Sequence, residues 1–594
     1  MEKLIDLSTT IEKPFSKLFF SVFQQPIERL LGIEDINGHY GRFYEKIFVQ
    51  SSNQSVFETL LETMDVRYRC DEAMLQQVPA SKSLVVVANH PFGGIEGVIL
   101  GAMISNIRSD VRILGNYLLK QIRGLGEWII PVNPFDNRNA YDNVTGLKQA
   151  LRWLNQGGAL IVFPAGEVAS WNRKRLMITD PDWSPHVAAL IRKSQATTLP
   201  VYVPGRNSAL FSVAGLLSPR LRTLLLPKEL VNKAHRQIPI HIGKPLSWSF
   251  LKRKEQDTHL IQYLRTTTEM LRYQKARKQW LADGIAPAFL RHRRRLAPLI
   301  PSVAADTLQR EIASLPMEQI LISTEDQVVC IASSDQIPHV LQEIGRLREQ
   351  SFRSVREGTG RPLDVDRFDA HYRHLFLFNR KTSEIVGGYR LGLVEEILTA
   401  HGRNGLYTNT LFRFHRSFFD PARHMIEFGR SFVRVEYQKK HNSLITIWRG
   451  IGEFIRRNPR YKILFGPVSI RNDYHGFSKR LLVRYLMHAH GEPNLSSLVK
   501  PRRPYRMGPR IPIHRDPDFT HAEAIEDVSH WISQLEADGK SIPTLVKHYL
   551  KLNGKVLGFN IDTDFSEVID ALILVDLDKT DSRIYKRFVG ETDA

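Results

Sequence analysis

Apolar runs and helical stretches alternate along the first half of the chain, and this alternation predicts its fold. Residues 84–88 are apolar without a break, which is typical of a strand covered on both faces. Residues 95–104 then show the apolar spacing of a helix. The pattern continues with strands predicted at 111–114, 129–132, 159–163, 198–203 and 238–242, and helices at 118–128 and 142–155. It predicts an α/β domain.

The first buried strand ends in a polar, glycine-rich turn that carries a His and an acid. In α/β sheets ligands bind beyond the carboxyl ends of the strands, where His90 would stand. Gly93 and Gly94 allow a tight turn, so that Glu96 lies in the first turn of the following helix. If Glu96 holds one ring nitrogen, the other can take a proton from a hydroxyl, as general-base catalysis requires. The alternative is a structural His with an acid favoured by the helix dipole.

This stretch resembles the glycerolipid and lysophospholipid acyltransferase family, whose first motif is Asn-His, four residues, then Asp. Asn89 and His90 match, whereas the acid stands one residue later and is a Glu, Glu96. The resemblance implies that His90 is the base for an acceptor hydroxyl and that Glu96 orients it. Asp110 and Glu127 are the other candidates for the acid. Backbone N–H groups of the glycine-rich turns are candidate oxyanion donors.

The family's third motif is Phe-Pro, any residue, Gly, then Thr or Glu and commonly Arg. Residues 163–167 match it, and Val168 stands where the Arg is usual. In the family this loop binds the acceptor's polar or phosphate group, so the loss of the Arg suggests an acceptor other than lysophosphatidate. Looser matches to the second and fourth blocks lie at 115–126 and 198–207, where Arg206 is a candidate anion ligand. The resemblance assigns these residues to substrate binding: Asn89, Gly93, Gly94, Phe163, Pro164, Gly166 and Glu167.

The second half restarts the alternation with different elements, so a new domain is predicted from residue 306 onward. A helix, two strands joined by a turn, a third strand and another helix are expected at 337–353, 374–378, 385–391, 425–433 and 443–455. These strings resemble the acetyltransferase-like fold, in the branch of autoinducer synthases and ornithine lipid N-acyltransferases. The expected fold class is therefore α/β with two domains, one glycerolipid-acyltransferase-like and one acetyltransferase-like.

Glu427, at a strand position that borders the expected cleft, is the candidate base of the second domain. It can accept a proton, directly or through water, from an amine that attacks a thioester. The alternative is a strand-edge carboxylate paired with Arg430, and the resemblance assigns Arg430 and Ser431 to substrate binding. Three acids within residues 364–369 raise the question of calcium. They lack the full ligand spacing of a calcium loop, so helix capping and solvation are favoured.

The loop that binds the pyrophosphate of coenzyme A in this fold is missing, because residues 434–442 contain no Gly. Acyl carrier protein, which is strongly acidic, is therefore the expected donor, and the net charge of +20 would serve its docking. Neither domain is expected to need a metal or an organic cofactor. The basic run at 291–295 has no aromatic interleaving or zinc-ligand spacing, so nucleic acid is not an expected partner.

Length and composition narrow the class of protein further. The 594 residues predict two or three domains, and the two cysteines, Cys70 and Cys330, argue against a disulfide scaffold. Without a signal peptide or a long uncharged apolar stretch, a cytoplasmic protein is expected, held peripherally on the inner face of the cell membrane. Two short amphipathic helices within 14–32 could lie at that interface, although packing onto the first domain is favoured.

The pairing of the two domains resembles the bifunctional ornithine lipid synthases. The resemblance implies that the second domain joins a 3-hydroxyacyl group from acyl carrier protein to the α-amine of ornithine. The first domain would then esterify the 3-hydroxyl of this lyso-lipid with a second chain. Glycine or lysine as the amine, or a second half that only docks on a membrane or a carrier protein, are the alternatives. The expected segments are amphipathic helices at 1–60, the O-acyltransferase domain at 61–270, a basic linker at 271–305 and the N-acyltransferase domain at 306–594.

Overall fold

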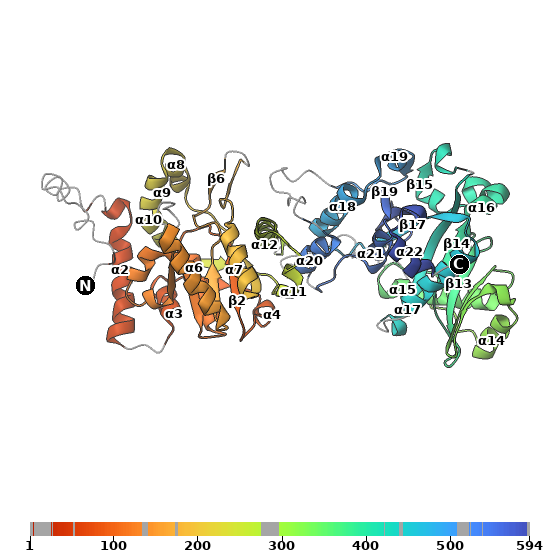
Figure 1. Cartoon of the computed structure of the whole chain (residues 1–594), viewed down its shortest axis with the longest axis horizontal. Helices are drawn as coiled ribbons and strands as arrows, with labels where there is room; N and C mark the ends of the chain where they lie inside the picture. Colours follow the sequence, from red (N-terminus) through yellow and green to blue (C-terminus); the bar gives the residue numbers. More distant parts are fainter. Residues whose placement is uncertain are drawn as a thin grey trace. The chain divides into compact units, whose positions relative to one another are not determined.

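The computed structural model of the chain contains two compact units (Figure 1). Unit 1 comprises Met1–Ala276 and Arg510–Ala524, and unit 2 comprises Arg277–Pro509 and Ile525–Ala594. Most of the expected amphipathic stretch 14–32 and of the expected linker 271–305 lies outside the described residues. The structure describes all residues except 1–3, 5–24, 26–27, 51–53, 133–139, 173–175, 275–295, 421, 439–442, 508–521, 523, 537 and 591–594.

Unit 1 is built on a six-stranded sheet with the order β10-β8-β2-β5-β3-β4. Neighbouring strands pair in parallel, except that β10 at the edge runs antiparallel to β8. The α/β fold predicted for this half is confirmed. The strands are β2 (Leu84–Ala88), β3 (Val111–Asn116), β4 (Ile129–Val132), β5 (Ala159–Val162), β8 (Thr197–Tyr202) and β10 (His241–Ile242).

Strand β2 is buried on both faces, in keeping with its unbroken apolar sequence. Leu84 and Val86 belong to a core cluster that includes side chains of α3 and α5. Val85 and Val87 point to the opposite face, because side chains alternate along a strand, and they are fully buried too. The helices of unit 1 are α2 (Ile33–Tyr44), α3 (Val56–Thr63), α4 (Glu72–Leu75), α5 (Ile95–Ser105), α6 (Ala140–Asn155), α7 (Pro185–Ser194), α8 (Ala209–Leu217), α9 (Pro219–Leu224), α10 (Leu226–Val231), α11 (Trp248–Leu251) and α12 (Asp257–Met270).

The adjacent parallel strands β5, β2 and β8 bring three loops together at one edge of the sheet. These loops hold the sequence motifs that follow each strand, at 89–96, 163–168 and 203–207. Two short pairs of strands lie outside the main sheet: β1 (Arg67–Arg69) with β9 (Gln237–Pro239), and β6 (Ser170–Asn172) with β7 (Met177–Thr179).

The helix predicted at 118–128 is wrong. The chain forms two short 3-10 turns there, Tyr117–Gln121 and Gly126–Trp128. Gly124 between them has φ +91°, a left-handed conformation that ends a helix. Gly126 then passes so close to the backbone of Lys120 that a Cβ would lie 2.2 Å from its carbonyl oxygen. The two glycines therefore hold this segment in a compact turn, although its apolar pattern is typical of a helix.

Unit 2 is built on an eight-stranded sheet with the order β11-β12-β13-β14-β16-β17-β20-β19. The acetyltransferase-like α/β arrangement expected for this half is confirmed by this mixed sheet, in which β16 and β17 alone among the neighbours pair in parallel. The strands are β11 (Ile320–Ser323), β12 (Gln327–Ala332), β13 (Arg373–Asn379), β14 (Glu384–Leu393), β16 (His424–Val433), β17 (Tyr461–Ile470), β19 (Lys555–Asp562) and β20 (Val568–Asp576); β15 (Phe412–Phe414) pairs with β18 (Val499–Pro501) apart from it.

Two long helices cover opposite faces of this sheet. Val328 and Cys330 of β12 pack into one cluster with α15 (Pro338–Ser354). Val329 points the other way, against Gly450 of α17 (Ser443–Arg457). The remaining helices of unit 2 are α14 (Ala305–Ala313), α16 (Val394–His401), α18 (Gly476–His490), α19 (Pro493–Ser496), α20 (Ile525–Leu535), α21 (Thr544–Lys551) and α22 (Ser582–Val589).

Strands β16 and β17 separate part of the way along the sheet. Their pairing runs from His424 to Glu427 on β16 and ends opposite Phe465 on β17. Beyond that point β16 continues beside β14, and β17 continues beside β20. Arg430, with φ +51°, lies in a bulge at which two residues of β16 face one residue of β14. Glu427 therefore stands where the two strands part.

Candidate active sites

In unit 1 the side chains of His90 and Glu96 face each other across the turn after β2. Nδ1 of His90 lies 2.9 Å from Oε1 of Glu96, whose side chain is fully buried. Glu96 also accepts hydrogen bonds from the backbone N–H groups of Phe92 (2.9 Å), Gly93 (2.9 Å) and Gly94 (3.0 Å). Gly93 has φ +93°, a conformation that favours glycine. One carboxylate therefore contacts the imidazole and fixes the turn that carries it.

The charges of this pair are arranged for a proton relay. Burial lowers the pKa of His90, but the charge and contact of Glu96 raise it more, so that the pKa lies above its ordinary value. Burial raises the pKa of Glu96, but His90 and the backbone N–H groups outweigh it and hold the pKa at about 2. An ionised carboxylate beside Nδ1 keeps the proton on that nitrogen and leaves Nε2 to accept one. The side chain of His90 is 16% exposed to solvent.

Backbone N–H groups of the glycine-rich turns were expected to be free to bind an oxyanion. This expectation is wrong for the N–H groups whose acceptors the structure shows. Those of Phe92, Gly93 and Gly94 all point at Glu96. The N–H of Gly166, in the turn after β5, donates to the carbonyl of Phe163 at 3.0 Å. Each of these N–H groups already donates to an acceptor inside the protein, so its role is to stabilise the loop.

Asn89 joins the ends of β2 and β8. Its Nδ2 donates to the carbonyl of Val203 at 2.8 Å, and the N–H of Val203 donates to its Oδ1 at 2.7 Å. Both polar atoms of the Asn89 side chain therefore bond to the backbone of Val203, the residue that follows β8. The residue sets the position of the His90 turn relative to the loop after β8.

Asp180 is a buried acid beside His90 that the sequence motifs did not indicate. Its carboxylate accepts a hydrogen bond from the backbone N–H of His90 at 3.2 Å and from the indole N–H of Trp183 at 3.1 Å. Burial raises the pKa of Asp180 to about 6, against the opposing effect of these donors. Asp180 belongs to the loop after β7, far from His90 in sequence, so a motif search around the His cannot find it.

The loop after β5 lies against the same imidazole. The ring of Phe163 stacks on His90 with centroids 4.4 Å apart and planes 29° from parallel. Gly166 turns the chain with φ +69°, and the carbonyl of Pro164 accepts a hydrogen bond from the loop before α7. Glu167 forms an ion pair with Arg222 of α9 at 2.7 Å. Of the predicted binding residues in this loop, Phe163 is the one whose contact with His90 the structure records.

A polar cavity of about 730 Å³ adjoins the His90 turn at Phe92. Asn207, in its wall, donates from Nδ2 to the carbonyl of Phe92 at 3.1 Å, and its buried Oδ1 has no hydrogen-bond partner among the described residues. The exposed Arg206 and Arg236 also line the cavity. Arg206, the candidate anion ligand, thus lies in the wall of this cavity.

Lys233 is the buried cation of this cavity. Its ammonium lies 3.3 Å from Glu229 and 4.8 Å from the centre of the Phe92 ring. Glu229 also accepts from the N–H and the hydroxyl of Ser208, so its carboxylate is shared among several donors. Burial lowers the pKa of Lys233, and Glu229 opposes that change. With two further arginines in the wall, the cavity favours an anionic ligand.

In unit 2, Glu427 is buried, and each of its carboxylate oxygens accepts a hydrogen bond. The hydroxyl of Tyr372 donates to one of its oxygens at 2.6 Å, and the N–H of Thr408 donates to the other at 2.6 Å. The hydroxyl of Tyr372 in turn accepts from the N–H of Tyr407 at 2.9 Å. Burial raises the pKa of Glu427, although both donors lower it. Such a carboxyl group holds a proton more readily than an exposed one does.

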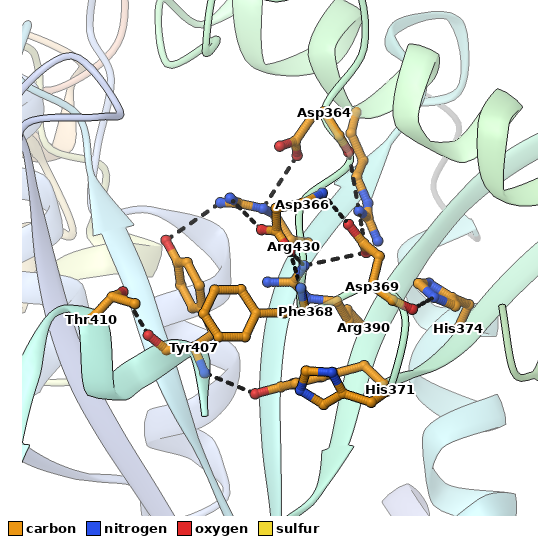
Figure 2. Close-up of polar contacts among 12 residues, drawn as sticks. Asp364, Asp366, Phe368, Asp369, His371, His374, Arg390, Tyr407, Thr410 and Arg430 are labelled. Atoms are coloured by element: carbon orange, nitrogen blue, oxygen red, sulfur yellow. Dashed lines mark hydrogen bonds and ion pairs between the residues drawn. The ribbon is translucent and has the colours of Figure 1, made fainter. Parts of the chain in front are cut away.

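The alternative pairing of Glu427 with Arg430 is not what the structure shows. Figure 2 shows Arg430 turned toward Asp364 and Asp366, which it contacts at 3.2 Å each. The guanidinium also lies 4.9 Å from the ring centre of Tyr407. Arg430 therefore belongs to a separate charged cluster next to Glu427.

That cluster pairs the three acids of the 364–369 loop with three arginines (Figure 2). Arg390, fully buried, contacts Asp366 at 2.6 Å and Asp369 at 3.2 Å, and Arg348 contacts Asp369 at 2.9 Å. Backbone N–H groups also donate to two of these acids, from Phe368 to Asp366 at 2.9 Å and from Asp366 to Asp369 at 2.8 Å. The expected capping is therefore confirmed for Asp366 and Asp369, within the loop, whereas ion pairs with arginines take the place of the expected solvation. In the part of the chain that the structure describes, no group of three or more His, Cys, Asp or Glu is placed to hold a metal ion.

Ser431 follows Arg430 in the bulge and lies opposite Tyr389 of β14. Burial raises the pKa of Tyr389 to about 12, and a hydrogen bond with Ser431 opposes that change. Ser431 therefore contacts the neighbouring strand, whereas Arg430 contacts the 364–369 loop.

Comparison with known proteins finds a family model that matches part of each unit. Residues 21–276 match the Acyltransferase family, and residues 347–448 match the Acetyltransferase (GNAT) domain. Glycine N(alpha)-acyltransferase of Phocaeicola vulgatus is 28% identical over 295 residues, which cover 47% of this chain and 88% of that protein. Lyso-glycine lipid O-acyltransferase of the same species is 24% identical over 234 residues, which cover 37% of this chain and 80% of that protein.

Among solved structures, the 1-acyl-sn-glycerophosphate acyltransferase of Thermotoga maritima aligns with a TM-score of 0.26 and 14% identity. The alignment covers 40% of this chain and 88% of that one. By the two family matches and the acyltransferases among its relatives, the chain is an acyltransferase in which an acyltransferase domain is followed by a GNAT-type acetyltransferase domain.

Proposed function

We propose that the chain is a bifunctional aminolipid synthase, in which unit 2 acylates an amino acid and unit 1 then acylates the product. The observation that carries this proposal is the presence of two separate sites on one chain, an imidazole base at His90 and a carboxyl base at Glu427. The names of the two relatives support it, since one acts on an amino acid and the other on a lyso-lipid of that amino acid.

In unit 1 the proposed acceptor is the 3-hydroxyl of an N-acylated amino acid. Nε2 of His90 takes the hydroxyl proton while the oxygen attacks the carbonyl carbon of an acyl thioester. The C–S bond then breaks, an ester forms, and the imidazolium returns the proton to the leaving thiolate. Glu96 holds Nδ1 protonated throughout and stabilises the imidazolium.

In unit 2 the proposed acceptor is the neutral α-amine of an amino acid. Its nitrogen attacks the carbonyl carbon of a 3-hydroxyacyl thioester, the C–S bond breaks, and an amide and a thiol result. The amine proton passes to Glu427 through the Tyr372 hydroxyl or a water molecule, because that hydroxyl covers one carboxylate oxygen. Glu427 then returns the proton to the thiolate, so the cycle needs no further reactant.

Acyl carrier protein is the proposed donor for both steps. The net charge of +20 favours an acidic partner, and the glycines that bind the pyrophosphate of coenzyme A are missing at 434–442. The partner and the lipid substrates also imply a cytoplasmic protein at the inner face of the membrane. Comparing acyl carrier protein with acyl coenzyme A in purified assays tests the donor directly.

Ornithine is the first candidate for the amine, and the acids around Tyr407 support it. Asp562 accepts from the Tyr407 hydroxyl at 3.4 Å, and Asp570 accepts from Ser469 at 3.1 Å. Burial raises the pKa of both, and their mutual repulsion adds to this for Asp570. A second ammonium group on the acceptor would favour the ionised form of both carboxyl groups and pair with it.

Glycine is the second candidate for the amine, because both curated relatives carry it in their names. In either case the lyso-lipid retains the carboxylate of the amino acid. The cavity beside Phe92, with Lys233, Arg206 and Arg236 in its wall, is where unit 1 would bind that carboxylate.

Lipid mass spectrometry of a host that expresses the chain tests the proposal. Feeding isotope-labelled ornithine, lysine or glycine shows which head group is incorporated. His90→Ala should accumulate the N-acylated intermediate, whereas Glu427→Ala should abolish both products. Undiminished diacylated lipid in the His90 variant would reject the assignment of unit 1. Binding to acyl carrier protein without any amine acylation would instead make unit 2 a docking module.

A further inference from the structure

Two consecutive helices of unit 1 present large apolar side chains to solvent. Six residues of α8 and α9 are exposed in this way: Leu210 (53%), Val213 (53%), Leu216 (46%), Leu217 (77%), Leu221 (47%) and Leu224 (52%). The β6–β7 hairpin, which contacts α8, adds Trp171 (41%) and Leu176 (63%). These eight residues form what we call the α8–α9 surface.

Helix α8 is apolar on both sides. Phe211 and Ala214 face the interior of unit 1, where they are 1% and 8% exposed. Leu210, Val213 and Leu217, at helical spacing, face outward. A helix that only covers a core has a polar outer face, and single exposed leucines are ordinary, whereas a continuous cluster marks a binding surface.

Helix α9 of the α8–α9 surface contacts the loop after β5, and α10, the next helix, contacts the His90 turn. Arg222 of α9 passes Gly215 of α8, where a Cβ would lie 3.2 Å from its Cδ, and pairs with Glu167 after β5. Leu226, which begins α10, packs on the His90 turn, since a Cβ at Gly93 would lie 2.7 Å from its side chain. The helices that carry the apolar surface therefore lie next to the loops that hold the candidate active site.

The start of α8 belongs to the wall of the polar cavity. Ser208 caps the helix, accepting a hydrogen bond from the N–H of Phe211. Ser208 and Ala209 line the cavity together with Asn207, which holds the carbonyl of Phe92. One end of the apolar surface thus meets the cavity proposed for the acceptor's carboxylate.

We propose that the α8–α9 surface inserts into the interface of an anionic lipid bilayer and delivers the lipid acceptor to His90. The inference rests on the proposed function, which requires an acceptor with one long chain and a charged head. The chain would remain among the bilayer lipids beside the leucines, while the head enters the cavity.

A bilayer fits this surface better than a protein partner does. The leucines project from two short helices of nine and six residues, as in helices that lie in the plane of an interface. The net charge of +20 favours anionic lipids. Among the described residues no helix is long and apolar enough to cross a membrane.

The test uses the full chain and its double variant Leu217→Asp, Leu221→Asp. Co-sedimentation with vesicles of phosphatidylglycerol and phosphatidylcholine should fall by at least about tenfold, since two apolar side chains are lost and two negative charges added. Val144→Asp, a replacement of another exposed apolar residue of unit 1, is the matched control and should bind as the wild type does. Vesicles of phosphatidylcholine alone should bind the wild type more weakly.

A second measurement separates this inference from the proposed function. The double variant should lose O-acylation of a long-chain lyso-lipid in vesicles by about tenfold, yet stay within about twofold of wild type with a short-chain acceptor in solution. Vesicle binding equal to wild type would overturn the inference. So would a wild-type dimer that the double variant converts to monomers without loss of vesicle binding. If no acceptor is acylated at all, the proposed function fails while the binding result still stands.

Discussion

The carboxylate of Glu96 lies 2.9 Å from Nδ1 of His90 and at the same time holds three backbone N–H groups of the turn between them. The acid therefore has two tasks, to orient the base and to fix its loop. A Glu one position beyond the usual Asp reaches both, because its extra methylene spans the turn. Glu96 thus makes both contacts although it stands one residue later than the Asp of the resembled motif.

The pH dependence of unit 1 should report this pair. O-acylation should rise with pH through a pKa above the ordinary 6.5 of His90, because the imidazole accepts a proton only when neutral. Glu96→Gln removes the charge that raises this pKa, so the acidic limb should move to lower pH. The rate constant kcat should fall by about a hundredfold, since an amide no longer fixes the tautomer.

Asp110→Asn is the matched control for this measurement. Asp110 is, with Glu127, one of the two other candidates for the acid, and the structure pairs it with Arg108 at 2.7 Å. Its replacement should leave the acidic limb in place. An unchanged limb in the Glu96 variant, or a shifted one in the Asp110 variant, would contradict the assignment.

We expect the ionised carboxylate of Asp180 to lower the free energy of unfolding although it supports the activity of unit 1. Its pKa of about 6 exceeds the ordinary 3.8, so the folded state binds the proton more tightly and loses stability as the pH rises between these values. Asp180→Asn removes that cost and should raise the free energy of unfolding at pH 8 by about 1–3 kcal/mol, but not at pH 4. Denaturant titrations at both pH values measure this.

The two replacements of Asp180 should differ in activity. In Asp180→Asn the amide oxygen can still accept the N–H of His90, whereas Asp180→Ala leaves that N–H and the Trp183 indole without a partner. We expect kcat of O-acylation to fall by less than about tenfold for the Asn variant and by about tenfold or more for the Ala variant. Equal losses in both variants would show that the hydrogen bond to His90 does not position the base.

Local sequence was enough for the elements whose side chains face a core. The unbroken apolar run at 84–88 and the hairpin around 379–384 were predicted because burial and turn chemistry act over a few residues. The backbone of Lys381 and Thr382 indeed donates to Asn379 in that hairpin. The motif residues His90 and Glu96 could also be found, since they are close in sequence.

Features that depend on distant partners could not be predicted in this way. Strand β17 is the strand from which β16 parts at Glu427. The sequence did not predict it, because Gly466 and Pro467 interrupt its apolar pattern. Asp180 and Lys233 were missed since their roles come from contacts with remote loops. Arg348 and Arg390 are charged residues that only a folded chain shows to be buried.

Lys233→Met should weaken the binding of an acceptor that carries a carboxylate. The substitution keeps the length of the side chain and removes the buried ammonium, so KM for the N-acylated amino acid should rise by about tenfold with kcat little changed. A carboxamide version of the same acceptor should show no difference between the two proteins. Lys252→Met, at an exposed site outside the cavity wall, is the control. Equal KM changes for both acceptors would reject the role of Lys233.

Asp562→Asn should distinguish the two amine candidates in unit 2. If the acids near Tyr407 bind the side-chain ammonium of ornithine, KM for ornithine should rise by about tenfold, because one charge-assisted contact is lost. N-acylation of glycine should be unaffected, since glycine has no second amine. Competition between the two labelled amino acids measures this ratio. A wild-type protein that prefers glycine would show that the acids serve the fold alone.

Tyr372→Phe should shift the pH profile of unit 2 in the direction opposite to that of Glu96→Gln in unit 1. The Tyr372 hydroxyl donates to Glu427 at 2.6 Å and lowers the pKa of that carboxyl group, against the burial that raises it. Without the hydroxyl the pKa of Glu427 rises further, so the acidic limb of N-acylation moves to higher pH. Because the proton path through the hydroxyl is also lost, kcat should fall by about ten- to a hundredfold while KM for the amine stays near wild type. Tyr437→Phe, in a hydroxyl contact with Glu384 on the same sheet, is the control and should leave the profile unchanged. A Tyr372 variant whose limb stays in place would mean that Glu427 does not take the amine proton.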